Sequence, residues 1–177
     1  PYVARIFVAA SNTNTVHVLG ITAANDVRPA EVINVAMTPR QPAGMTPSAL
    51  GFDAGRNWLY VACSDANAVT IIDVSGGRSR VLGMLPAGWY PTAVRSLGDG
   101  KLAVINARGS GGDPAGSVSL VQVFGGEELD AATRAVFVNS PYRDDLLDNA
   151  GGPNGNPAPS RAGGAPPIEH VFYLIKG

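Results

Sequence analysis

Short apolar stretches recur along the chain, each followed by a polar turn and a second apolar stretch. Residues 6–19 read IFVAASNTNTVHVL, and residues 59–72 repeat the same layout as LYVACSDANAVTII. A looser third copy covers residues 102–106 and, after an insertion, residues 118–121. Apolar runs of about four to eight residues bounded by turn signals are typical of β-strands. The pattern therefore predicts a repeated strand–turn–strand unit.

The flanks of each unit repeat as well and extend the unit to four strands. Residues 46–50 match residues 90–94, and each is followed by a turn rich in Asp, Gly and Asn. These residue types supply the positive φ that tight hairpins need. A further β-rich stretch closes each unit, at residues 30–35, 80–85 and 134–138. The units recur about every 43 to 53 residues, close to the roughly 40 to 50 residues of a propeller blade.

The fold class that this repeat predicts is all-β: about three β-propeller blades of four antiparallel strands, in a partial ring. The first unit lacks its first strand, so two complete units and one incomplete unit are expected. The second strand of a unit is apolar on both faces, as expected for a strand covered by neighbouring blades. A closed propeller needs about 4 to 8 blades. Three interpretations stay open: part of a longer propeller, a ring completed by two or more chains, or another fold.

The character of the chain changes at Ser140. Ser and Pro are favoured at the cap and first position of a helix, and Ser140 and Pro141 therefore predict a short helix over residues 141–147. Residues 149–167 are rich in Gly, Pro, Asn and Ala, which predicts an extended linker. Residues 168–175 form one further apolar strand pattern without a sequence partner. The predicted domains are blades over 1–139, a helix and linker over 140–167, and the start of another domain over 168–177.

Composition and charge narrow the function classes. The 177 residues carry a formal net charge of −1, and no electrostatic attraction to nucleic acid or to an anionic membrane is expected. No apolar stretch approaches the roughly 20 residues that span a bilayer. Cys63 is the one cysteine, so no disulfide can form within the chain. Pro1 stands directly before a strand pattern without a signal-peptide layout, and we expect the chain to be trimmed from a longer protein.

Four segments of the units carry a family resemblance: residues 47–50 (PSAL), 58–62 (WLYVA), 67–73 (NAVTIID) and 88–94 (GWYPTAV). They resemble the YncE-like (YVTN) β-propeller family of bacterial surface and periplasmic proteins. This resemblance implies a periplasmic or secreted location and a rigid module for recognition. Such repeats are specific for the fold rather than for the function.

The tail carries a second resemblance. Residues 139–143 (NSPYR), the linker and residues 168–176 (IEHVFYLIK) are similar to the joining region of a two-part family, in which a YncE-like propeller precedes a phosphoesterase of the alkaline phosphatase superfamily. In that family the strand continues into Glu-Asn-Arg-Thr-Tyr-Asp, and the Glu-Asn pair helps to hold the catalytic divalent metal. This sequence departs from the pattern with Gly177. The resemblance therefore implies a parent phosphoesterase with a divalent metal. It places no catalytic residue, metal ligand or cofactor in this chain. Whether the protein is an enzyme stays open at this point.

Trp89 and Tyr90 are the first candidates for ligand binding. They fall in the connection from the last strand of one blade to the first strand of the next, near a ring face and the central channel. Exposed aromatic residues there are the kind that dominates binding energies, while packing between blades is the alternative role. Asn106 and Arg108, at the end of a second strand, are candidates of the same kind. The expected partners are a protein or small-molecule ligand at a propeller face, and further blades of the same protein or a second copy.

Other polar groups have simpler interpretations. His17 is expected to be a polar strand position, and Cys63 a small buried residue rather than a nucleophile. The Asn and Asp residues of 12–14 and 65–67 are expected to form turns, since they lack the extended ligand set of a calcium loop. The Gly-rich stretch 109–116 lacks the Gly-Lys-Ser/Thr ending of a phosphate-binding loop and predicts a long hairpin insertion.

Overall fold

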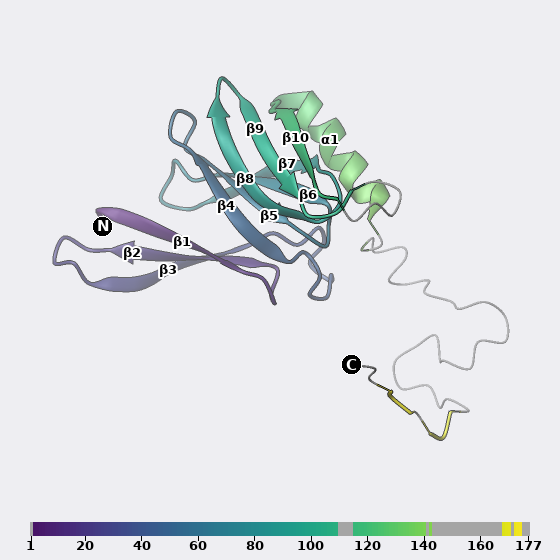
Figure 1. Ribbon diagram of the computed structural model, residues 1–177. Helices are drawn as coiled ribbons and strands as arrows, with labels where there is room; N and C mark the ends of the chain where they lie inside the picture. The colour runs from purple at the N-terminus through teal and green to yellow at the C-terminus, as the bar shows by residue number, and fades with distance from the viewer. Residues whose placement is uncertain (1, 110–114, 141, 143–167, 171, 175–177) are drawn as a thin grey trace.

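The computed structural model describes residues 2–109, 115–140, 142, 168–170 and 172–174. Over these residues the strands form three antiparallel sheets, and the helix α1 (Gly126–Asn139) follows the last strand (Figure 1). Blade 1 contains β1 (Ala4–Ala10), β2 (Thr15–Ile21) and β3 (Val27–Asn34). Blade 2 contains β4 (Pro47–Asp53), β5 (Trp58–Cys63), β6 (Ala68–Asp73) and β7 (Arg80–Pro86). Blade 3 contains β8 (Pro91–Gly98), β9 (Lys101–Asn106) and β10 (Ser117–Gln122).

Each sheet keeps its strands in sequence order, so consecutive antiparallel strands pair with one another. This arrangement confirms the predicted all-β fold of propeller blades in a partial ring, and blade 1 lacks a first strand as predicted. The turns also have the expected geometry. Between β8 and β9, Gly98, Asp99 and Gly100 have φ values of 81°, 48° and 72°, in the left-handed region that Gly and Asp tolerate.

The fourth strand predicted for blade 3 at residues 134–138 is wrong, because this stretch lies inside α1. Blade 3 therefore has three strands, and blade 2 is the four-stranded sheet of the described chain. Residues 127–135 read EELDAATRA, in which strong helix formers predominate. Leu129, Thr133 and Val136 recur at helical spacing. The five residues RAVFV at 134–138 are too few to show that period by themselves.

The helix α1 packs against the outer strand β7 of blade 2. The backbone N–H of Met84 donates a hydrogen bond to Thr133 Oγ1 at 2.9 Å, and Leu129 and Val136 are buried. A Cβ atom on Gly83 would lie 2.6 Å from Thr133 Oγ1, so glycine is what allows the helix to approach so closely. The helix thus covers this outer edge and supplies a hydrogen-bond partner for the N–H of Met84.

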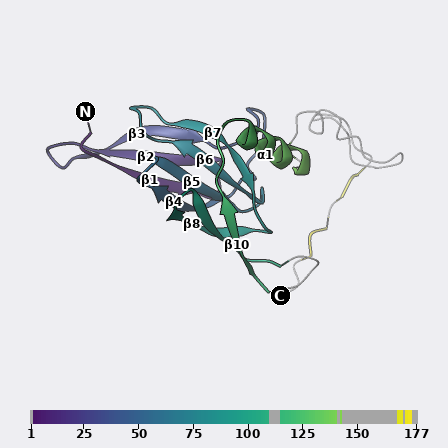
Figure 2. The same ribbon diagram turned by 90° about the horizontal axis from the view of Figure 1, so that it is seen from above.

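Blade 2 lies between the other two blades (Figure 1 and Figure 2). Its central strands β5 and β6 are buried on both faces, which confirms the expectation for sandwiched strands. One core cluster joins blades 1 and 2, and a second joins blades 2 and 3. The first includes Val16, Val18, Ile33, Leu59, Val61, Ile72 and Met84, and the second includes Tyr60, Val69, Ile71, Val94, Leu102 and Val104.

The tail is described only in part. Ser140 is the C-cap of α1, with its N–H donating to the carbonyl of Phe137 at 3.2 Å. The short helix predicted over 141–147 lies outside the described residues except for Tyr142, and the linker predicted over 149–167 lies outside them altogether. Of the last predicted strand, the described residues 168–170 and 172–174 belong to no sheet. Whether this segment opens another domain stays a prediction.

Candidate ligand-binding site

The connection between β7 and β8 carries Trp89 and Tyr90, at the place that the repeat predicts. The N–H of Tyr90 donates to the side-chain Oδ1 of Asn67 at 2.8 Å. On its other side, the N–H groups of Ala107 and Arg108 donate to the carbonyls of Tyr90 and Trp89 at 2.9 Å and 3.2 Å. The connection is therefore held between the β5–β6 turn and the end of β9.

Tyr90 has an unusual backbone conformation. Its φ of 60° is in the left-handed region, which costs a bulky residue free energy and persists only where the surroundings enforce it. The same geometry occurs one blade earlier, where Thr46 has a φ of 50°. Both residues directly precede the proline that begins a first strand, Pro47 or Pro91. The repeat thus builds the same strained connection twice and changes only the side chains on it.

One side chain of the β7–β8 connection is much more open to solvent than its counterpart in the earlier connection. Trp89 is 50% exposed, whereas Met45, at the matching position, is fully buried. The guanidinium carbon of Arg108 lies 5.4 Å from the centre of the Tyr90 ring, within the range of a cation–π contact. Packing between blades therefore leaves half of the Trp89 surface available. The structure thus brings two aromatic residues and one cation together on an accessible surface.

Asn106 lies beneath this surface and is fully buried. Its Nδ2 donates to Ser117 Oγ at 3.2 Å and to Ser119 Oγ at 2.9 Å, while its Oδ1 has no hydrogen-bond partner among the described residues. A Cβ atom on Gly88 would lie 2.5 Å from Asn106 Nδ2. Asn106 therefore packs against the backbone of the connection and supports it from below. We call Trp89, Tyr90, Asn106 and Arg108 the Trp89 cluster.

Asn14 and Asn67 lie in the β1–β2 and β5–β6 turns, as predicted, and their side chains also hold the two connections. Asn14 Oδ1 accepts hydrogen bonds from the N–H groups of Gly44 and Met45 at 3.1 Å and 2.9 Å, and Asn67 Oδ1 accepts that of Tyr90. Each connection is also held by a serine of the preceding blade, whose hydroxyl donates to the carbonyl of the following proline; we call this bond the serine latch. Ser11 Oγ donates to the Pro47 carbonyl at 2.9 Å, and Ser64 Oγ donates to the Pro91 carbonyl at 2.6 Å. The matching residue in blade 3 is Ala107, which cannot donate such a bond.

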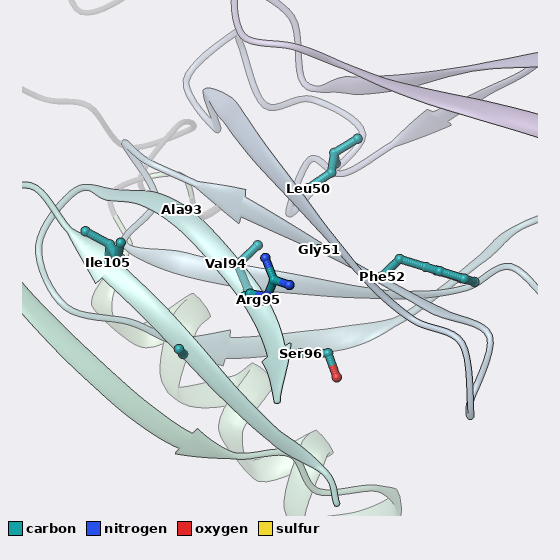
Figure 3. A pocket seen from close by; sticks show the side chains of 9 residues that line it. Leu50, Gly51, Phe52, Ala93, Val94, Arg95, Ser96 and Ile105 are labelled. Carbon is teal, nitrogen blue, oxygen red and sulfur yellow. The ribbon is translucent and has the colours of Figure 1, made fainter. Parts of the chain in front are cut away.

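A pocket of about 530 Å³ lies next to the cluster, along the first strands of blades 2 and 3. β4 and β9 contribute apolar side chains, and β8 contributes the guanidinium of Arg95 (Figure 3). The nine lining residues are Leu50, Gly51, Phe52, Ala93, Val94, Arg95, Ser96, Ala103 and Ile105. The strands pack tightly where they cross, because a Cβ atom on Gly51 would lie 2.7 Å from the Val94 carbonyl oxygen. Trp89 and Tyr90 of the cluster directly precede β8, and the pocket lies along the middle of that strand.

Sequence reasoning did not single out Phe52 and Arg95. The sequence signal that could have found them is their place on a predicted first strand. First strands face the propeller axis, and every second residue of a strand points away from the core. Arg95 is exposed and Val94 is buried, which follows that alternation. The alternation could have selected Arg95 as a channel-side cation.

The described residues hold little acid–base or metal chemistry. No group of three or more His, Cys, Asp or Glu residues among them could hold a metal ion. Burial raises the pKa of the Cys63 thiol to about 11, so it is protonated at neutral pH and lacks the thiolate that a nucleophile needs. His17 is exposed on β2. Residues 110–114 of the predicted Gly-rich insertion lie outside the described residues. Within the described part, no helix has the length and apolar character to cross a bilayer.

Comparison with known proteins gives similarity at the level of structure. No protein-family model matches the sequence, and no curated protein matches it. A functionally unknown protein from Desulfotomaculum acetoxidans DSM 771 is 19% identical with a TM-score of 0.46, over 69% of this chain and 38% of that protein. A protein from Lactobacillus plantarum is 20% identical with a TM-score of 0.43, over 68% of this chain and 38% of that one. Saccharomyces cerevisiae Sqt1 is 10% identical with a TM-score of 0.48, over 68% and 31%. The chain thus spans less than two fifths of these proteins.

Proposed function

We propose that this chain is a non-catalytic, YncE-like propeller module of a bacterial envelope or secreted protein, and that it binds a ligand through the Trp89 cluster. The observation that carries the proposal is the half-exposed Trp89 beside the Tyr90–Arg108 pair. The equivalent connection one blade earlier places a fully buried methionine at the matching position.

The cluster has the chemistry of a recognition surface. Trp, Tyr and Arg are the residue types enriched among those that dominate binding free energies. Hydrogen bonds on both sides fix the connection, so little conformational entropy is lost when a ligand binds. The exposed guanidinium of Arg108 favours a partner with a carboxylate. An acidic segment of a protein that contains an aromatic residue fits this set of groups.

Peptide selection on the immobilised chain tests the proposal. Displayed random peptides are enriched on the wild-type chain, and the dissociation constants of the selected peptides are then measured for Trp89→Ala and Arg108→Ala. We expect at least tenfold weaker binding for Trp89→Ala, which corresponds to about 1.4 kcal/mol. For acidic peptides, Arg108→Ala should raise the dissociation constant by a larger factor at low salt than at high salt, because salt screens the lost charge interaction.

Phe52→Ala is the matched control, because Phe52 is 52% exposed and lines the neighbouring pocket instead of the cluster. The selected peptides should bind this variant as they bind the wild type. Equal binding by Trp89→Ala and the wild type would overturn the proposal. Loss of binding in Phe52→Ala alone would instead place recognition in the pocket.

A second candidate function rests on the tail. Phe172, Tyr173 and Leu174 are 86% to 93% exposed, and exposed apolar side chains of this size favour burial against another surface. Together with the resemblance of residues 168–176, they support the amino-terminal part of a metal-dependent phosphoesterase, whose divalent metal and catalytic residues lie outside this chain. A phosphatase assay on the 177-residue chain with added divalent metal is expected to show no turnover above background. Metal-dependent turnover would contradict this placement of the catalytic residues.

A further inference from the structure

The two faces of blade 2 define which surfaces of a blade are contact surfaces. Its rear face, with Leu59, Val61 and Met84, packs against blade 1, and these residues are at most 3% exposed. Its forward face, with Val69 and Ile71, packs against blade 3, and these residues are at most 1% exposed. The same names, rear and forward, apply to the other blades through the sequence repeat.

Blade 3 exposes its forward face. Val118 and Leu120 on β10 occupy the repeat positions of Val69 and Ile71, but they are 67% and 76% exposed. Ile105 on β9, the direct partner of Val118, is 49% exposed. The next part of the chain does not cover this face, because α1 packs against β7 of blade 2.

Blade 1 exposes its rear face. Ile6 and Val8 on β1 occupy the repeat positions of Leu59 and Val61, but they are 42% and 44% exposed. Val32 on β3, which is paired with His17, is 58% exposed. The chain therefore carries an uncovered rear face at one end and an uncovered forward face at the other.

The polar groups at these two ends also match. The serine latch needs a hydroxyl on the forward side and a first-strand carbonyl on the rear side, as in Ser64 and Pro91. Blade 3 has Ala107 in place of the serine, so its forward side carries no hydroxyl that needs an acceptor on a docked blade. Lys101 stands at the repeat position of Arg5, which donates to the backbone carbonyls of Val74 and Gly76 across the blade 1–blade 2 contact.

We propose that two copies of this chain associate head to tail, with the forward face of blade 3 on the rear face of blade 1. Each contact joins the forward face of one copy to the rear face of the other, and in a ring of two copies a two-fold axis relates the two contacts. Two copies supply six blades, within the roughly 4 to 8 blades of closed propellers, so the two contacts can close a ring. The inference rests on the exposed end faces of blades 1 and 3 and does not depend on ligand binding by the Trp89 cluster.

Sedimentation velocity of the 177-residue chain over a range of concentrations tests the proposal. The wild type should sediment at twice the chain mass as concentration rises. Val118→Arg on the forward face and Val8→Arg on the rear face should each remain monomeric. Val138→Arg is the matched control, because Val138 has the same 67% exposure as Val118 but lies on α1, and it should dimerise like the wild type. Circular dichroism of every variant checks that its fold is retained.

Mixing the two monomeric variants identifies a head-to-tail contact. The Val118→Arg chain retains its rear face and the Val8→Arg chain its forward face, so the mixture should regain association through one intact contact. A wild type that stays monomeric at all concentrations overturns the proposal. The two end faces would then be contact surfaces for blades other than those of a second copy. Dimers that survive either single variant, or a mixture that fails to associate, also overturn it.

Discussion

Individual residues change the exposed surface of the repeat while its backbone stays the same. Thr46 and Tyr90 share the same left-handed backbone before a proline, yet one connection buries Met45 and the other exposes Trp89. The backbone is held by N–H groups of each connection that donate hydrogen bonds to Asn14 Oδ1 or Asn67 Oδ1, and the side chains are then free to differ. The two connections share the residues PAG and differ in the next two, Met45 and Thr46 against Trp89 and Tyr90, so two substitutions on a preserved scaffold separate a buried connection from a candidate recognition site.

Gly88→Ala tests whether Asn106 supports the Trp89 cluster. The added Cβ would lie 2.5 Å from Asn106 Nδ2, so the asparagine or the connection must move. We expect a loss of about 1 to 3 kcal/mol in the free energy of unfolding, measured by chemical denaturation. Trp89 fluorescence, recorded in a Trp58→Phe background, should shift as well. Gly77→Ala is the control, because nothing lies within 4 Å of a Cβ there, and equal stability of both variants would contradict this packing.

At the scale of elements, the helix α1 is the main departure from the repeat. It takes the sequence position of a fourth strand in blade 3, but it packs on the edge of blade 2. Thr133 is central to this contact, because its Oγ1 accepts from the N–H of Met84 and lies within hydrogen-bond distance of the Leu129 carbonyl. The helix thus covers the outer edge of blade 2, while β10 forms the edge of the sheet of blade 3.

Thr133→Val tests the contribution of that hydrogen bond. The substitution keeps the shape of the side chain and removes the acceptor for Met84 N–H, so we expect a loss of about 1 to 2 kcal/mol in stability. The Met84 amide should also exchange with deuterium faster than in the wild type. Val138→Thr makes the reverse change on an exposed part of α1 and should leave both measurements unchanged. Unaltered Met84 exchange in Thr133→Val would show that the helix does not protect this edge.

At the scale of the whole molecule, the structure is an arc with one enclosed blade and two half-covered ones. β5 and β6 are buried on both faces, whereas β1 and β10 each contain exposed apolar residues. Amide exchange reports local opening, which requires more free energy where more contacts must break. The stability of this chain should therefore be highest in blade 2 and fall toward both ends.

Hydrogen–deuterium exchange of the Val118→Arg variant, expected to be monomeric, measures this gradient without a second copy. Amides of β5 and β6 should be the slowest, and those of β1 and β10 should exchange at least tenfold faster, which corresponds to about 1.4 kcal/mol. In the wild type at high concentration, β1 and β10 should gain protection if the end faces meet. Uniform exchange rates over all three blades would contradict the gradient.

The sequence by itself determined most of the strands, their hairpin turns and the repeat, because strand alternation and the turn residues Gly, Asp and Asn act over a few residues. Only the tertiary structure decided the rest. Residues 134–138 are β-prone as five residues, whereas the longer stretch Gly126–Asn139 carries helical spacing in its sequence, and the tertiary structure decided that this helix packs on β7 of blade 2. The exposure of Trp89 and of the end faces depends on which surfaces other blades cover, and such contacts between distant residues are not written in any short stretch of sequence.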